Sequence, residues 1–352
     1  MTVGAHATTM PSPRRDHPAT ATRPSRHWPP FVAATVLALA AVVVFATPVP
    51  GVARAVSSRA TARAAARAAL QAARTAANEV PADTLLPVAS TSVTLVDDTR
   101  PTPARGDTPA SPSRTLTVTI TAPDVDDGAR YPLVVFVHGY DADAATYAAL
   151  ESELAARGFV VAAPDFPLSS SALNGAPERD IVEQATDVSF VITALLGDAS
   201  PGVRSEIADT PVAVVGHSDG AVTAAGVAFN DGYADSRIGA AVVLSGAEAF
   251  FPGPWFDNAG TPALLAIHGS DDEVNPFAAS TTLYDDDPGA VKALVAVDGG
   301  SHLGPFTTDG VRPAIATLIA DFLRGQLVGD SDATARVVAD AGAPGLSLVA
   351  SS

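Results

Sequence analysis

The chain has 352 residues, of which 47% are hydrophobic, and it carries a formal net charge of −17. It contains no cysteine, which excludes disulfide bonds, thiolate catalysis and cysteine-ligated zinc sites. Residues 81–352 hold 36 of the 38 acidic residues but only 12 of the 21 basic ones. A body this acidic repels phosphates, so nucleic acid is excluded as a partner.

The N-terminal segment has the pattern of an export signal. Residues 1–30 are polar, proline-rich and basic, and residues 31–46 are apolar except for Thr35. At about 1.5 Å per residue, a helix over this run is shorter than the ~30 Å apolar core of a bilayer. Ala53-Arg54-Ala55 matches a small-x-small cleavage site. The pattern favours a secretory signal cleaved after Ala55 over a retained anchor, which would associate with the membrane through residues 31–46. We therefore expect an exported protein, either extracellular or held at the outer face of the cytoplasmic membrane.

Residues 56–85 are expected to form an alanine- and arginine-rich spacer. Arg59, Arg63 and Arg67 recur every four residues, so in a helix they would share one face. A basic helix on anionic lipid or on the acidic body is one interpretation. A solvated spacer is favoured, because no large apolar face lies opposite the arginines.

Residues 86–327 alternate between strand and helix patterns, and most of the strands are apolar throughout. Strands that are buried on both faces belong to a mostly parallel sheet covered by helices, so we predict a single α/β domain over residues 86–327. Residues 328–352 are small, polar and without a pattern, and are expected to be a disordered C-terminal tail. Strands are predicted at residues 88–96, 114–121, 132–137, 159–163, 212–215, 238–244, 263–267 and 290–297, and helices at residues 144–157, 177–196, 221–228 and 311–327.

The motif Gly216-His217-Ser218-Asp219-Gly220 follows one of these apolar strands and precedes a helix. G-x-S-x-G in this setting is the nucleophile elbow, a turn so tight that small residues must flank the serine. The N-terminus of the following helix directs free N–H groups at the same place, which favours a developing negative charge. Ser218 is therefore predicted to be a nucleophile.

A serine hydroxyl needs a base to take its proton, and the base needs an acceptor that holds it in the right tautomer. Two later strand exits supply candidates: His302 as the base and Asp272 as the acceptor. The carboxyl ends of strands gather at one edge of an open α/β sheet, and elbows of this kind use the chain order serine, acid, histidine. Asp271 and Asp272 cannot both face the imidazole, and Asp272 is favoured because it lies at the far end of the turn.

An oxyanion hole needs two N–H donors. The candidates are the backbones of Asp219, which follows the serine, and of Tyr140, which follows a strand end. The Asp219 carboxylate is predicted to point away from the site. His138, His217 and His268 are expected to be structural residues that bond to backbone groups.

Three stretches resemble the α/β-hydrolase superfamily: residues 131–165, residues 187–191 and the elbow. The chain is similar, over about residues 86–327, to the branch of platelet-activating-factor acetylhydrolases, chlorophyllases, dienelactone-hydrolase-like proteins and bacterial cutinase-like polyester hydrolases. True dienelactone hydrolases use a cysteine, and that chemistry is not carried over. The residue after the serine departs from the small or apolar residue that the family often has there. The resemblance implies a carboxylic-ester hydrolase with a triad of Ser218, Asp272 and His302 and with oxyanion donors at Tyr140 and Asp219.

The densest aromatic cluster follows the strand after the elbow helix, where pocket walls form. Phe250, Phe251, Trp255 and Phe256 are predicted to line an acyl or aryl pocket, with core or lid packing as the alternative. The acidic run at residues 285–287 could hold calcium, but a solvated loop is favoured. We expect no metal and no cofactor.

These patterns predict an exported or membrane-anchored serine hydrolase that cleaves carboxylic esters through an acyl-enzyme. The substrate is expected to be a small-molecule, lipid or polymer ester. Two alternatives stay open: an amidase or peptidase on the same triad, and a non-catalytic surface protein on a hydrolase scaffold. A dehalogenase is excluded, because it would need aspartate at position 218.

Overall fold

The computed structural model describes residues 84–126, 128–173, 175–197, 201–257, 261–308 and 310–352. The predicted signal at residues 31–46, the cleavage site after Ala55 and the spacer up to residue 83 lie outside the described residues. In the described part, no helix is both long enough and apolar enough to cross a membrane.

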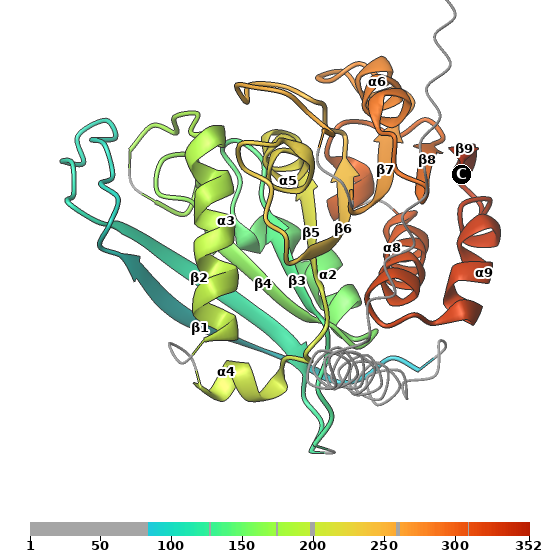
Figure 1. Cartoon of the computed structure of the whole chain (residues 1–352), viewed down its shortest axis with the longest axis horizontal. Coiled ribbons are helices and arrows are strands. Elements are labelled where there is room, and N and C mark those ends of the chain that lie inside the picture. Colours follow the sequence, from blue (N-terminus) through green and yellow to red (C-terminus); the bar gives the residue numbers. More distant parts are fainter. Residues whose placement is uncertain (1–83, 127, 174, 198–200, 258–260, 309) are drawn as a thin grey trace, which may run out of the picture. The chain divides into compact units, whose positions relative to one another are not determined.

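One nine-stranded sheet forms the centre of the described part, in the order β1-β2-β4-β3-β5-β6-β7-β8-β9 (Figure 1). The strands from β4 to β8 in this order run parallel, and β1, β2 and β9 are antiparallel additions at the two edges. The predicted mostly parallel sheet is therefore confirmed. The strands are β1 (Val88–Asp97), β2 (Arg114–Pro123), β3 (Leu133–Val137), β4 (Val160–Asp165), β5 (Val212–His217), β6 (Ile238–Leu244), β7 (Ala263–Gly269), β8 (Lys292–Val297) and β9 (Leu346–Ser351).

Helices cover both faces of this sheet, as the apolar strands require. Side chains of α3 and α5 share one hydrophobic core with one face, and side chains of α2 and α8 share a second core with the other face. The predicted α/β class is confirmed. The helices are α2 (Ala144–Ala155), α3 (Ile181–Leu196), α4 (Pro201–Glu206), α5 (Asp219–Phe229), α6 (Ala278–Asp286), α7 (Gly304–Thr307), α8 (Arg312–Leu327) and α9 (Ser331–Asp340).

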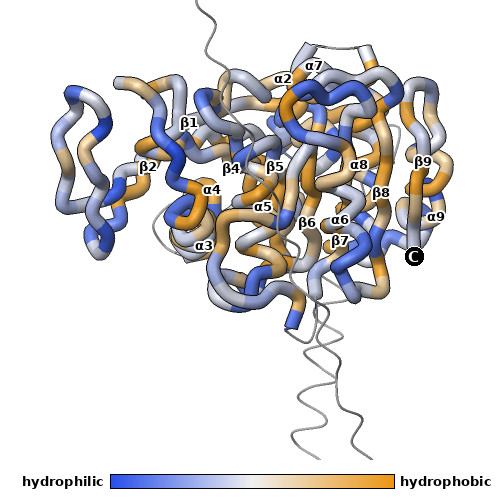
Figure 2. The backbone as a smooth tube through the Cα atoms, turned by 90° about the horizontal axis from the view of Figure 1, so that it is seen from above, coloured by the Kyte–Doolittle hydropathy of each residue, from blue (hydrophilic) through white to orange (hydrophobic). Residues whose placement is uncertain are grey.

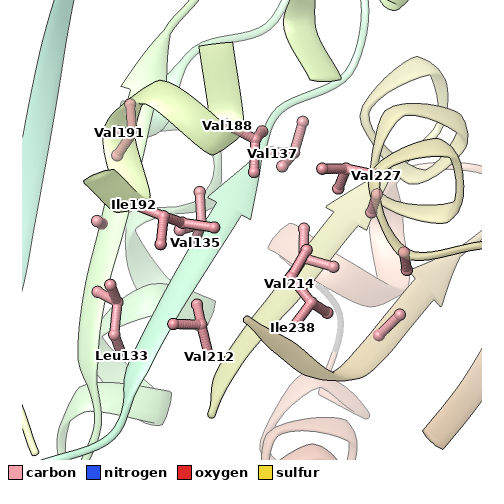
Figure 3. Packing of buried hydrophobic residues seen from close by; sticks show 14 of the residues in the cluster. Leu133, Val135, Val137, Val188, Val191, Ile192, Val212, Val214, Val227 and Ile238 are labelled. Carbon is pink, nitrogen blue, oxygen red and sulfur yellow. The ribbon is translucent and has the colours of Figure 1, made fainter. Parts of the chain in front are cut away.

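Strand β3 shows why the central strands are apolar throughout. Val135 and Val137 belong to the core under α3 and α5, whereas Val134 and Phe136 belong to the core under α2 and α8. Successive side chains of a strand point to opposite faces, so both sets must be hydrophobic when both faces are covered. Figure 3 shows the first core from close by, with β3 side chains beside those of α3 and β5. Figure 2 shows hydrophobic residues concentrated in the central strands and hydrophilic ones in the loops.

Residues 328–352 are ordered, so the prediction of a disordered tail is wrong. They form α9, which packs on α8, and β9, which pairs with β8. Ala333 and Leu346 are buried, and Arg336 donates two hydrogen bonds of 2.7 Å to Asp321 on α8. The sequence pattern is weak because the buried contacts use alanine and glycine, which permit close packing but carry little hydrophobic signal.

Replacing Gly325 with valine should loosen α9 from α8. A Cβ at this position would overlap the side chain of Thr334. Overpacking of this kind typically costs about 1–3 kcal/mol, so the thermal midpoint should fall by roughly 2–10 °C in a circular dichroism melt. Gly310→Ala is the matched control, because nothing lies within 4 Å of its added Cβ. Equal midpoints for the two variants would contradict the close packing of α8 and α9.

Glu151 on α2 is a buried carboxyl group. It is 1% exposed, and its Oε1 atom has no hydrogen-bond partner among the described residues. Burial, followed by the nearby Asp165 and Asp143 carboxylates, raises the pKa of Glu151 well above its usual value. The folded protein therefore prefers the protonated side chain.

Glu151→Gln should remove a pH dependence of stability. In the unfolded chain a glutamate loses its proton near pH 4.3, whereas folded Glu151 keeps it to higher pH. The wild type should therefore lose stability as the pH rises from about 4.3 toward the raised folded pKa. Urea unfolding should show the variant more stable than the wild type at pH 8 and similar to it at pH 4. Exposed Glu178→Gln is the control, and a pH-independent difference between Glu151→Gln and the wild type would refute the argument.

Candidate active site

The turn after β5 holds Ser218 in a strained conformation, with φ of 56° and ψ of −124°. A Cβ on Gly216 would overlap the carbonyl of Gly220, and a Cβ on Gly220 would overlap the carbonyl of Val137. Only glycine fits at these two positions, which is the reason for the spacing of the motif. Backbone strain of this kind costs about 1–3 kcal/mol and persists only where its surroundings enforce it.

Ser218, His302 and Asp272 are hydrogen-bonded in series. The Ser218 Oγ lies 2.9 Å from His302 Nε2, and His302 Nδ1 lies 2.7 Å from Asp272 Oδ2. A carboxylate only accepts, so Nδ1 carries the imidazole proton and Nε2 accepts from the serine hydroxyl. Asp271, by contrast, is exposed, so it is Asp272 that faces the imidazole. The geometry allows the serine proton to pass to the imidazole.

Asp272 is held as an anion. Its side chain is fully buried, and its Oδ1 accepts the backbone N–H groups of Val274 and Asn275 at 2.8 Å each. Burial alone would raise the pKa of Asp272, but the hydrogen bonds from His302 and from these two N–H groups outweigh it and bring the pKa below its usual value. The charge facing His302 is therefore fixed in place.

His217 joins three parts of the site through buried hydrogen bonds. Its Nε2 lies 2.8 Å from the carbonyl of His302, and its Nδ1 lies 2.7 Å from the hydroxyl of Tyr147, which also accepts the N–H of Gly139 at 3.4 Å. A carbonyl only accepts, so Nε2 carries the proton and Nδ1 accepts from Tyr147. Burial, and then the charge of His302, lowers the pKa of His217 to about 3, so the ring is neutral at physiological pH.

Tyr147→Phe should lower turnover without unfolding the protein. Phenylalanine fills the same space beside Phe136, but it removes the hydroxyl that fixes the tautomer of His217 and therefore the bond to the His302 carbonyl. We expect kcat for a p-nitrophenyl ester to fall about tenfold, with KM within about twofold. Tyr233→Phe is the control, because Tyr233 lies past the far end of α5. A Tyr147→Phe variant with wild-type kcat would show that this chain of bonds does not position His302.

Tyr140 and Asp219 present backbone N–H groups that no acceptor occupies within the described residues. The turn before Tyr140 lies against the elbow, because a Cβ on Gly139 would stand 3.2 Å from the Ser218 Cβ. The carboxylate of Asp219 accepts a 2.8 Å hydrogen bond from Arg179 Nε. Both N–H groups are thus available to a ligand.

The aromatic cluster is divided between a surface groove, the core and the C-terminal end of α5, so the prediction that its four members line one pocket is wrong, whereas the alternative of core packing holds for Phe251. Phe250 is 63% exposed and lines a groove of about 380 Å³ at the start of α3. Phe251 is buried in the core. Trp255 and Phe256 lie at the C-terminal end of α5, where the N–H of Phe256 bonds to the last residue of the helix at 2.9 Å. Eleven residues of helix separate them from Ser218 by roughly 16 Å.

The three histidines predicted to be structural, at positions 138, 217 and 268, all contact backbone carbonyls. Two of them also contact the hydrogen-bonded series of Ser218, His302 and Asp272. His217 bonds to the backbone of His302, and His268 Nε2 lies 3.2 Å from Asp272 Oδ2. The position of His217 beside the serine is a signal for its role. No pattern in the sequence identifies Tyr147 or Arg179 as residues of the site. No group of acidic and histidine side chains suited to a metal ion occurs in the described part of the chain.

Part of the chain matches a known protein family. A family model described as Chlorophyllase matches residues 91–246. The match extends from β1 to just beyond β6, and it includes Tyr140, Ser218 and Asp219 but stops before Asp272 and His302. No curated protein matches the chain.

Proposed function

We propose that this esterase-type member of the α/β-hydrolase superfamily cleaves carboxylic esters through an acyl-enzyme, with Ser218 as the nucleophile, His302 as the base and Asp272 as the group that orients the base. The observation that carries the proposal is the unbroken series of hydrogen bonds, 2.9 Å from Ser218 to His302 and 2.7 Å from His302 to Asp272, at a strained elbow. A non-catalytic scaffold would have no need to maintain this strain.

In the first half-reaction, the Ser218 Oγ attacks the ester carbonyl while its proton passes to His302 Nε2. The N–H groups of Tyr140 and Asp219 stabilise the negative charge on the carbonyl oxygen. The intermediate collapses, and His302 returns the proton to the departing alcohol. In the second half-reaction His302 takes a proton from water while the water oxygen attacks the acyl carbon. The bond between the acyl carbon and the Ser218 Oγ then breaks, His302 returns its proton to that oxygen, and the carboxylic acid leaves. The Asp272 anion stabilises the imidazolium that forms in each half.

Ser218→Ala should abolish ester hydrolysis, lowering kcat/KM for p-nitrophenyl butyrate by more than about a thousandfold. The wild type, but not this variant, should be labelled by a fluorophosphonate probe. Ser205→Ala, an exposed serine on α4, is the matched control. Hydrolysis by Ser218→Ala at the wild-type rate would overturn the assignment. A matched p-nitroanilide, if cleaved faster than the ester, would favour an amidase or peptidase.

The proposal includes export of the protein. It is supported by the apolar run at residues 31–46 and by the sequence Ala53-Arg54-Ala55, which has the form of a signal-peptide cleavage site. N-terminal sequencing of protein recovered from the medium should begin at Val56, whereas a start at residue 1 in a membrane fraction would favour a retained anchor. The ester itself is proposed by class only, as a small-molecule, lipid or polymer ester, and a series of p-nitrophenyl esters of increasing acyl length would define it further.

A further inference from the structure

The side chains of the two oxyanion donors are both held by one short segment. We call residues 175–180, which lead into α3, the bracket. The hydroxyl of Tyr140 donates a 2.8 Å hydrogen bond to the carbonyl of Pro177, and Arg179 Nε donates one of 2.8 Å to the Asp219 carboxylate. The guanidinium of Arg179 also lies over the ring of Tyr140, 5.4 Å from its centre. Arg179 thus contacts both residues that supply the proposed oxyanion N–H groups.

Two buried arginines fix the bracket at its two ends. Arg105, which is 3% exposed, donates hydrogen bonds to the carbonyls of Ser170, Gly175 and Ala176 at 2.7, 3.1 and 3.0 Å. A Cβ on Gly175 would lie 2.9 Å from the carbonyl of Arg105, so the two backbones meet closely.

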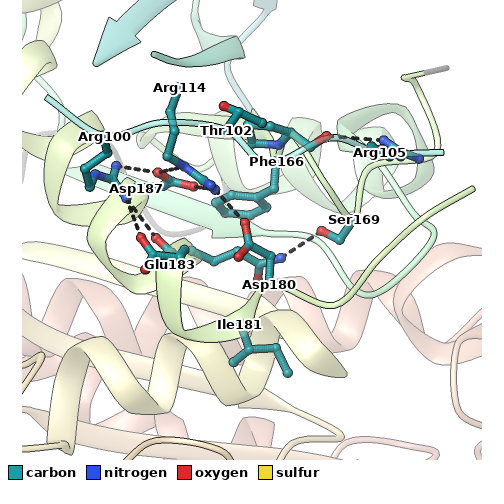
Figure 4. Close-up of polar contacts among 12 residues, drawn as sticks. Arg100, Thr102, Arg105, Arg114, Phe166, Ser169, Asp180, Ile181, Glu183 and Asp187 are labelled. Carbon is teal, nitrogen blue, oxygen red and sulfur yellow. Dashed lines mark hydrogen bonds and ion pairs between the residues drawn. The ribbon is translucent and has the colours of Figure 1, made fainter. Parts of the chain in front are cut away.

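Arg114 holds the other end of the bracket. It is 1% exposed and bonds to Asp180 at 2.7 Å and to the fully buried Asp187 of α3 at 2.8 and 2.5 Å. Figure 4 shows Arg114 directed at both acids. The backbone at Arg179, the neighbour of Asp180, is therefore held in place, although the Arg179 side chain is 62% exposed.

The carboxylate of Asp219 would repel the oxyanion that its own backbone N–H is proposed to stabilise. Its N–H is one of the two donors for the developing oxyanion, and its own carboxylate carries the same charge as that oxyanion. A free carboxylate on this residue would oppose the transition state. The contact with Arg179 both neutralises the carboxylate and holds it on the side of the bracket.

We propose that Arg179 is a positioning residue that neutralises Asp219 and holds its carboxylate off the oxyanion hole. This inference rests on the proposed esterase function. It assigns to Arg179 an effect on the stability of the transition state and little effect on the binding of a neutral ester. The pair is partly exposed, so salt should screen the effect.

The test compares kcat and KM for p-nitrophenyl butyrate in four proteins: wild type, Arg179→Ala, Arg179→Lys, and Arg179→Ala combined with Asp219→Ala. Arg179→Ala should lower kcat about tenfold with KM within about twofold. Removing the carboxylate as well should recover most of the lost kcat, and Arg179→Lys, which keeps the charge, should stay within about threefold of the wild type. Arg130→Ala is the matched control, because Arg130 pairs with Asp209 on the exposed surface before β5.

Ionic strength separates an electrostatic role from a structural one. Raising sodium chloride from about 0.02 to 0.5 M should increase kcat of Arg179→Ala relative to the wild type, because salt screens the unpaired Asp219. The proposal is overturned if the double variant is no faster than Arg179→Ala, if Arg179→Lys falls as far as Arg179→Ala, or if kcat of Arg179→Ala is that of the wild type. Failure of the wild type itself to hydrolyse the ester would instead refute the proposed function.

Discussion

The backbone at Ser218 is held in a conformation that an isolated chain avoids, and the neighbouring strands hold it there. Gly220 is pressed against the carbonyl of Val137 on β3, while the N–H of Ser218 donates a 3.0 Å hydrogen bond to Leu244 on β6. Because β5 lies between β3 and β6, the bend cannot relax without separating strands of the central sheet. The position of the proposed nucleophile is thus set by the sheet itself, and His302 and Asp272 are brought to it by loops that leave the same edge.

Burial keeps the ring of His217, the residue before Ser218, neutral. Its ring is fully buried, with its centre 4.7 Å from that of His302, so a charge on His217 would oppose the imidazolium that the proposed mechanism requires on His302. Desolvation removes this conflict by lowering the pKa of His217 to about 3. The neutral ring then serves as a donor on one side and an acceptor on the other, which places the His302 backbone relative to the elbow.

Features that depend on local sequence could be predicted, and features that depend on distant contacts could not. The apolar strands, the elbow at Ser218 and the loop exits at Asp272 and His302 are each visible within about ten residues of sequence. The sequence does not reveal that α9 is ordered, because its packing on α8 depends on a glycine and alanines. The contact of Arg179 with Asp219 joins residues forty positions apart, and no periodicity marks either as a partner. The aromatic residues within 250–256 look like one pocket wall in the sequence, because the sequence does not show that their loop runs along α5.

The buried side chains of Arg105 and Arg114 contribute more to the position of residues 175–180 than to the stability of the fold. A buried ion pair such as Arg114 with Asp187 adds little net stability, because the desolvation of both groups offsets their attraction. Arg114 also keeps one nitrogen, Nη1, without a hydrogen-bond partner among the described residues, which adds to the cost. Asp187 also accepts a 2.5 Å hydrogen bond from Arg100, and Arg114 also bonds to Asp180, so the buried charges are all paired only when the start of α3 keeps this position. The segment that leads into α3 has few apolar side chains. Its position is therefore fixed by ion pairs and hydrogen bonds, whereas hydrophobic packing fixes the other elements. The position of the proposed oxyanion donors therefore depends on electrostatic contacts, whereas the position of the proposed nucleophile depends on steric contacts with the sheet.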